Sequence, residues 1–303
     1  MKKDCANWMV GKSKLLSLAC LVLVASLIGC WLPDAQAAQI KRVQTGEIYF
    51  DADDISQVAE IVAVDQTKSL VLLYPKPDLN TTYNARQNIL FSADFGSNTE
   101  LVISRDGATY GVTARFYIIE FVDGVTVQRG VSSFASGSPT NPKYTTKSIS
   151  LSPSLTDYNN AVAIVQSRCA LTTTTSDEIA TVRASISDNN TLVLDRFETN
   201  QVLKSVNMVW QVVEFTKDVT VKHGTATIAI NSLTGTATVS PGIGTLGKTL
   251  LLFSYKAETA INGVEGYFDV KGEITNATTL TFTRGYQNNT ALTGITVSWF
   301  VIE

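Results

Sequence analysis

The sequence predicts an all-β protein made of three tandem, small antiparallel β-sandwich repeats that follow a signal peptide. One phrase occurs three times: "FYIIEFVDGVTVQRG" at 116–130, "WQVVEFTKDVTVKHG" at 210–224 and "WFVIE" at 299–303. Apolar and polar residues alternate in these stretches, which is typical of half-buried strands, and clusters of Asn and Gly between them indicate turns. A hydrophobic fraction of 45% against 17% charged residues suits packed cores rather than a disordered chain.

The repeats align on the Glu at the fifth position of the shared phrase in each copy. Spacings of 84 and 94 residues between the repeat starts exceed the ~20 to 50 residues of solenoid units, so each repeat is large enough to fold singly. We predict repeat 1 at 43–126, repeat 2 at 127–220 and repeat 3 at 221–303, with an insertion at 131–160. The repeat anchors are the aromatic residues Phe116, Trp210 and Trp299, the arginines Arg105, Arg196 and Arg284, and the glutamates Glu120, Glu214 and Glu303.

Several short strands are expected in each repeat. In "TLVLDR" (191–196) and "VNMVWQVVEF" (206–215) every second residue is large, so one face of each strand is buried. No stretch after the N-terminal segment has a convincing helical stripe, and "DADDISQVAEIV" (51–62) is the nearest candidate for a helical turn.

The N-terminal segment 1–37 is predicted to be a signal peptide, because a basic region precedes the apolar stretch "LLSLACLVLVASLIGC". Small residues at Ala35 and Ala37 favour cleavage after Ala37 and plain secretion. Alternatively, "LIGC" resembles the lipobox of bacterial lipoproteins, which would make Cys30 the lipidated first residue and attach the protein to a membrane. Either route places the protein outside the cytoplasm, as a secreted, extracellular or cell-surface protein.

Charge and cysteine content exclude several classes of function. Removal of 1–37 takes four Lys and two Asp from 24 basic and 27 acidic residues and leaves a net charge of −5, which disfavours a nucleic-acid partner. The other three cysteines lie in 1–37, so Cys169 is the one cysteine in the rest of the sequence. We therefore expect no intramolecular disulfide framework and no thiolate metal site.

Candidate catalytic chemistry is sparse. His223 is the single histidine, and its aligned residues are Thr45 and Arg129, so it occupies a variable position that we expect to be exposed. We predict no catalytic residues, no cofactor and no metal; "DADD" at 51–54 could offer calcium ligands, but solvated loop acids are favoured. A pair of carboxylates acting as in glycosidases remains an alternative.

Two further patterns have competing interpretations. The anchors Phe116, Trp210 and Trp299 are favoured as core residues over sugar-stacking platforms, since they lie on alternating apolar strands. The recurring Arg and Glu anchors are either one ion pair per repeat or, as favoured here, solvated strand ends. Any sugar contacts should come from turns that contain Tyr74, Tyr83, Tyr110, Tyr158 and Tyr286.

The last two strands of each repeat carry the pattern [ST]-x-L-x-[LIF]-x-R, followed by a strand with "VSW" or "VVE". This pattern resembles the end of the H-type lectin domain over about half of each repeat. The resemblance implies a compact six-stranded sandwich, carbohydrate binding and trimeric association, but it transfers no sugar-contacting residue to this sequence.

The function predicted from these patterns is that of a bacterial, non-catalytic binding or adhesion protein that recognises glycans or surface proteins through variable loops. The first alternative is a subunit of an extracellular filament or coat, which self-associates by β-strand pairing at the strand that ends at Glu303. The second alternative is a polysaccharide-acting enzyme.

Overall fold

The computed structural model describes the chain from Ala38 to its last residue, apart from several internal stretches. The described residues are 38–77, 89–107, 109–137, 145–169, 180–197, 204–258, 269–285 and 293–303. They belong to one compact unit, Ala38–Glu303. The predicted signal peptide with Cys30, and two of the tyrosines, Tyr83 and Tyr286, lie outside the described residues.

Repeat 1 contains six strands and one short 3-10 helix. Its elements are β1 (Ile40–Phe50), β2 (Ser56–Glu60), η1 (Gln66–Lys68), β3 (Ser69–Pro77), β4 (Phe91–Ser97), β5 (Glu100–Arg105) and β6 (Val112–Phe121). The strands form two antiparallel sheets with the orders β1-β6-β3 and β2-β5-β4. The closing strand β6 therefore lies in the middle of its sheet, between the first and third strands.

Repeats 2 and 3 have the same order of elements. Repeat 2 contains β7 (Val125–Phe134), β8 (Thr146–Ser150), η3 (Tyr158–Asn160), β9 (Ala161–Arg168), β10 (Val182–Asp188), β11 (Thr191–Arg196) and β12 (Val206–Phe215). Repeat 3 contains β13 (Val221–Ile228), β14 (Thr234–Thr238), η5 (Leu246–Lys248), β15 (Leu250–Ala257), β16 (Val270–Asn276), β17 (Thr279–Arg284) and β18 (Ile295–Ile302). The sheet orders are β7-β12-β9 and β10-β11-β8, then β13-β18-β15 and β14-β17-β16. The prediction of an all-β fold with three tandem sandwich units is confirmed.

The segment that was the nearest helix candidate, 51–62, contains a turn followed by strand β2 instead. Val58 and Glu60 alternate with residues that face the other side of the strand, so the period of two prevails over the short acidic start. Among the described residues, no helix has the length and apolar character needed to span a lipid bilayer.

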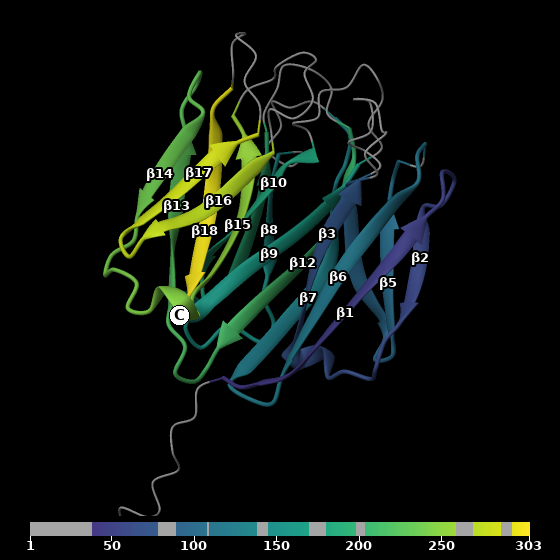
Figure 1. Cartoon of the computed structure of the whole chain (residues 1–303), viewed down its shortest axis with the longest axis horizontal. Coiled ribbons are helices and arrows are strands. Elements are labelled where there is room, and N and C mark those ends of the chain that lie inside the picture. Colours follow the sequence, from purple (N-terminus) through teal and green to yellow (C-terminus); the bar gives the residue numbers. More distant parts are fainter. Residues whose placement is uncertain are drawn as a thin grey trace, which may run out of the picture. The chain divides into compact units, whose positions relative to one another are not determined.

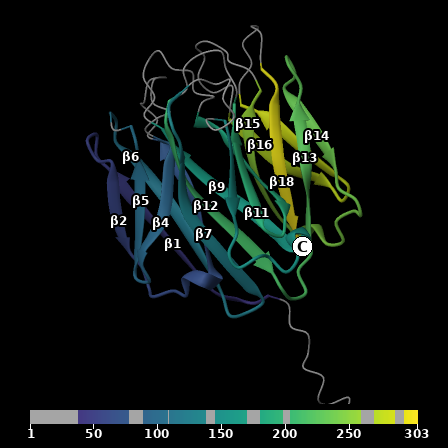
Figure 2. The same cartoon turned by 180° about the vertical axis from the view of Figure 1, so that it is seen from behind.

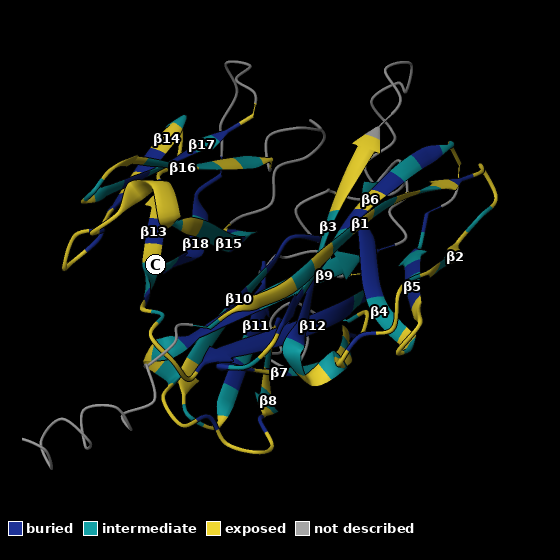
Figure 3. Ribbon diagram, turned by 60° about the horizontal axis from the view of Figure 1, so that its bottom comes forward, coloured by how far each residue is buried: buried dark blue, intermediate teal, exposed yellow. Residues whose placement is uncertain are grey.

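The cores of the three repeats are unequal. Repeats 1 and 3 each enclose a core built from their own residues. The core around repeat 2 is larger and also includes Leu70 and Phe121 of repeat 1 and Val221, Ala257 and Phe300 of repeat 3. Figure 3 shows β12 buried along its length, whereas the end of β3 is exposed. The middle repeat thus packs against both neighbours.

The two junctions between repeats use equivalent elements. At the first junction, η1 and β4 of repeat 1 lie against β7, β9 and β12 of repeat 2. At the second, η3 and β10 of repeat 2 lie against β13, β15 and β18 of repeat 3. Figures 1 and 2 show repeat 2 between the other two from both sides. Each junction therefore joins the 3-10 helix and fourth strand of one repeat to the sheet with the closing strand of the next.

Candidate functional site

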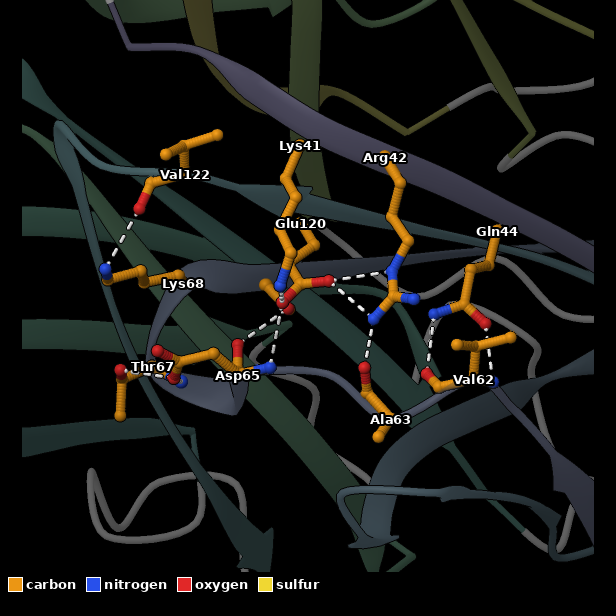
Figure 4. A network of polar contacts seen from close by, with 11 residues as sticks. Lys41, Arg42, Gln44, Val62, Ala63, Asp65, Thr67, Lys68, Glu120 and Val122 are labelled. Atoms are coloured by element: carbon orange, nitrogen blue, oxygen red, sulfur yellow. Dashed lines mark hydrogen bonds and ion pairs between the residues drawn. The ribbon is translucent and has the colours of Figure 1, made fainter.

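The three glutamate anchors hold equivalent loops. In repeat 1 the Glu120 carboxylate accepts hydrogen bonds from Lys41 Nζ (2.8 Å), Arg42 Nε (2.8 Å) and the backbone N–H of Asp65 (3.1 Å), as Figure 4 shows. Burial alone would raise the pKa of Glu120, but these donors outweigh it and lower the pKa below its usual value. Asp65 is the N-cap of η1, so Glu120 fixes the position of that helix.

The other two glutamates repeat this arrangement. Glu214 accepts the backbone N–H groups of Thr156 (2.6 Å) and Asp157 (2.9 Å), which precede η3. Glu303 accepts those of Gly244 (2.6 Å) and Thr245 (2.9 Å), which precede η5. The shared "E" of the repeated phrase therefore positions the 3-10 helix in every repeat.

The three arginine anchors are buried at the other end of the closing strand. Arg105 donates to the carbonyl oxygens of Asp54 (2.7 Å) and Tyr110 (2.8 Å) and also contacts that of Asp51. In repeat 2, Arg196 donates to the carbonyls of Lys204 (2.6 Å) and Ala135 (3.1 Å). Arg284 of repeat 3 donates to Thr293 O (2.8 Å) and Ala229 O (3.3 Å). Each guanidinium thus ties the chain before the closing strand to the end of an earlier strand.

Both interpretations of the Arg and Glu anchors were wrong. Arg105 and Glu120 do not pair, because Arg105 lies beside the start of β6 and Glu120 near its end, eight residues or about 26 Å along the strand. They are not solvated strand ends either, since Arg105, Arg196 and Arg284 are 0–2% exposed. Burial lowers the pKa of Arg196 to about 10 and leaves the guanidinium charged at neutral pH.

The aromatic anchors lie in the cores. Phe116, Trp210 and Trp299 are 5–8% exposed. Each lies opposite the glycine that opens its repeat, Gly46, Gly130 or Gly224. The rings offer no open face to a sugar. Among the described tyrosines, Tyr74 and Tyr110 are 51% and 37% exposed, and Tyr158 lies partly buried against His223.

His223 is half-buried, not exposed as predicted, because it lies in the second junction between the rings of Tyr158 and Phe300. Burial lowers its pKa, and Asp157 opposes this effect. In the acidic segment, the Asp54 carboxylate accepts the Asp51 N–H (2.9 Å) and Gln57 Nε2 (2.7 Å), so it closes a turn. Within the described ranges, no three His, Cys, Asp or Glu side chains lie close enough together to hold a metal ion.

A polar pocket of about 490 Å³ lies beside the first junction. Ser92 on β4 contributes from repeat 1, and the other lining residues come from strands β7, β8, β9 and β12 of repeat 2. The polar residues that line it are Ser92, Ser132, Ser133, Lys147, Arg168 and Asn207. The junction thus brings three hydroxyls, two cations and one amide to a single concave surface.

Asp106 of repeat 1 organises the pocket. Its carboxylate forms an ion pair with Arg168 and accepts a hydrogen bond from Asn207 Nδ2 (2.9 Å). Arg168 Nε also donates to Ser92 Oγ (3.1 Å), so repeat 1 holds the guanidinium on two sides. Lys147, which is partly buried, donates to the Ser133 carbonyl (3.2 Å), and its ammonium group has two further N–H donors for a ligand.

The pocket suits a small hydroxylated ligand with negative charge. Hydroxyl and amide groups exchange hydrogen bonds with ligand hydroxyls, and Lys147 favours an anionic substituent, whereas the charge of Arg168 is balanced by Asp106. Sequence reasoning missed this site because its residues come from separate strands. One signal was available, since the aligned residues of Arg168 are Lys76 and Lys256, both basic.

A second concave surface of about 770 Å³ lies on repeat 1 alone. It is lined by Leu72, Tyr74, Pro75, Lys76, Arg115, Tyr117 and Ile119 of β3 and β6. These residues occupy the face that covers a neighbouring repeat in repeats 2 and 3.

No protein-family model and no curated protein sequence matches the chain.

Proposed function

We propose that this chain is a non-catalytic, extracellular binding or adhesion protein that recognises an acidic glycan in the polar pocket beside the first junction. The observation that carries this proposal is the grouping of Lys147, Arg168, Asn207 and three serines around about 490 Å³. Such a volume falls within the ~300 to 1,000 Å³ range of small-molecule sites.

The site proposed here differs in position from the one expected from the sequence. Variable loop tyrosines were expected to contact the sugar, whereas the pocket is formed by strands of two repeats. Strands hold side chains more rigidly than loops do, which lowers the entropic cost of binding. Asp106 supports the same conclusion, because its contacts with Arg168 and Asn207 preorganise two of the donors.

The binding proposal is tested by screening the purified protein against neutral and acidic glycans and measuring the affinity of any ligand by calorimetry. Lys147→Gln removes one of the two cations that line the pocket and should weaken binding at least tenfold. Lys271→Gln removes an exposed cation on β16 that does not line the pocket, and should leave affinity unchanged. Binding of neutral glycans alone, or equal affinity of Lys147→Gln and the unaltered protein, would contradict the proposal.

Extracellular placement rests on the predicted signal peptide. Determination of the N-terminal residue of the protein isolated from its cells separates the two routes. A first residue of Ala38 supports secretion after cleavage at Ala37, whereas a lipidated Cys30 supports membrane attachment. An intact Met1 on cytoplasmic protein would contradict both.

The alternative of a filament or coat subunit needs a different basis from the one predicted. The strand that ends before Glu303, β18, pairs with β13 on one side and β15 on the other. It therefore offers no open position for a strand from another molecule. Self-association is better argued from the faces of the repeats.

A further inference from the structure

We infer that copies of this chain associate head to tail, with repeat 3 of one copy docked on the exposed sheet of repeat 1 of the next. The head face of a repeat is the outer face of its sheet with the closing strand, which includes Val43, Tyr74, Lys76 and Tyr117 in repeat 1. The tail face is the 3-10 helix with the start of the third strand and the fourth strand, which includes Leu246, Leu250 and Gly272 in repeat 3.

The two junctions inside the chain are the same interface made twice. At the first, the backbone N–H of Ala93 donates to Gln166 Oε1 (2.7 Å). At the second, the N–H of Ala184 donates to Ser254 Oγ (2.9 Å). Ala93 and Ala184 are equivalent, and so are Gln166 and Ser254, by their register in the sheets. A tail face thus binds a head face through side chains at equivalent positions in both places.

The 3-10 helix also contacts an equivalent residue at each junction. Arg129 of repeat 2 donates to the carbonyl of Gln66, the first residue of η1 (2.6 Å). His223 of repeat 3 lies against the ring of Tyr158, the first residue of η3 (6.0 Å between centroids). The corresponding first residue of η5 is Leu246, which is 51% exposed.

A cation crosses each junction from the same position of the third strand. Arg168 on β9 pairs with Asp106 of repeat 1, and Lys256 on β15 pairs with Asp195 of repeat 2 (3.0 Å). Lys76 is the equivalent residue on β3. It is 63% exposed and lies 3.8 Å from Glu47 of its own repeat, so it remains accessible to an acidic group of another molecule.

Burial at equivalent positions indicates that the head face of repeat 1 and the tail face of repeat 3 are not covered within the chain. On the head side, Val127 and Val221 are 5% and 6% exposed, whereas Val43 is 50% exposed. On the tail side, Leu70 and Val162 are 2% and 0% exposed, whereas Leu250 is 43% exposed. The registers of these six strands place the residues at matching sites.

The unused tail face has the same support as the two that are occupied. Glu303 accepts the N–H groups that precede η5, just as Glu120 and Glu214 fix η1 and η3. The unused head face is also concave, with about 770 Å³ between its tyrosines, Leu72 and Ile119. Both halves are therefore preorganised, which lowers the cost of joining them.

The occupant follows from the symmetry of the contact. A head-to-tail interface is heterologous, so each use leaves one free head and one free tail, and association continues unless the rotation closes a ring. Val43 and Leu250 are exposed in the same chain, so the chain does not close on itself. The partner whose tail matches the head of repeat 1 is repeat 3 of a second copy.

The test uses the protein purified from the cells that produce it and measures mass by sedimentation velocity over a concentration series. We expect the mass of the unaltered protein to rise with concentration beyond that of one chain. Val43→Asp damages only the head and Leu250→Asp only the tail, and each should weaken association at least tenfold. Ile55→Asp and Ile230→Asp change residues that are 60% and 62% exposed outside both faces, and should associate normally.

Mixing the two variants gives the decisive result. Val43→Asp retains an intact tail and Leu250→Asp an intact head, so their mixture should form a dimer of one copy of each and stop there. Circular dichroism and thermal unfolding should match those of the unaltered protein, because both side chains are exposed. A single-chain mass at all concentrations up to about 100 µM, undiminished association of either variant, or no dimer in the mixture would overturn the inference.

The outcome is separable from that of the glycan proposal. Val43 and Leu250 do not line the polar pocket, so both variants should bind a glycan ligand as single chains. If association holds, several pockets are joined in one particle, and binding to a surface with many glycans gains avidity without new contacts.

Discussion

Gly130 lies directly opposite Trp210 in the sheet of repeat 2, and a Cβ atom placed on Gly130 would come within 2.7 Å of the indole Cζ2. The same pairing joins Gly224 to Trp299, again at 2.7 Å, and Gly46 to Phe116 at 2.4 Å. The glycine that opens each repeat thus makes room for the aromatic residue that closes it. Each copy of the long phrase therefore begins with the aromatic residue of one repeat and ends with the glycine that packs against the aromatic residue of the next repeat.

Substitution of Gly130 by Ala should therefore destabilise the protein by about 1–3 kcal/mol, the usual cost of overpacking a filled core. Urea unfolding measures the change. Gly247→Ala is the matched control, since a Cβ there meets nothing within 4 Å, and it should change stability little. Equal effects at the two positions would show that the indole of Trp210 does not constrain Gly130.

A double-mutant cycle measures whether the arginine and glutamate anchors interact energetically. Arg196→Met should cost about 3 kcal/mol, because it removes the hydrogen bonds that the buried, charged guanidinium donates to the carbonyls of Lys204 and Ala135. Glu214→Gln should cost less, since an amide oxygen still accepts the N–H groups of Thr156 and Asp157. The two effects should add within about 0.5 kcal/mol, as expected for residues far apart. A larger coupling energy would contradict the conclusion that Arg196 and Glu214 form no ion pair.

Protonation of Glu120 should destabilise the protein in acid. Its pKa in the folded state is lowered, so its contribution to stability is present above the unfolded pKa near 4.5 and is lost as pH falls through the folded value. Glu120→Gln should therefore be less stable than the unaltered protein at pH 7, and the difference should shrink below pH 4. Thermal unfolding between pH 3 and 7 checks this, and a difference that is constant with pH would contradict it.

His223 should give the second junction a pH dependence in a higher range. Burial lowers its folded pKa below 6.5, so folding favours the neutral ring and its contribution is complete above the unfolded pKa. Stability should fall as pH drops from about 7.5 to 5.5, because the unfolded chain takes up the proton first. His223→Gln should abolish this part of the pH profile of the unfolding free energy, whereas Lys271→Gln should leave it unchanged.

The alternation of residues and the recurrence of one phrase were enough to predict the strands, the sandwich class and the number of repeats. These features are local, since alternation decides which face of a strand is buried regardless of its partner. The residue pairs Arg105 with Glu120 and Arg196 with Glu214 could not be placed from spacing. Their relation depends on where the chain crosses between sheets, and the crossing puts them at opposite ends of the closing strand.

The sequence by itself determined the repeated sandwich and the place of the aromatic anchors in the cores. The tertiary structure alone decided that repeats pack head to tail, that Arg168 meets Asp106 beside a polar pocket, and that Val43 and Leu250 are exposed where their equivalents are buried. The physical reason is that burial at a junction depends on which repeat lies opposite. Equivalent sequences in three repeats have three different neighbours, and only the folded chain specifies them.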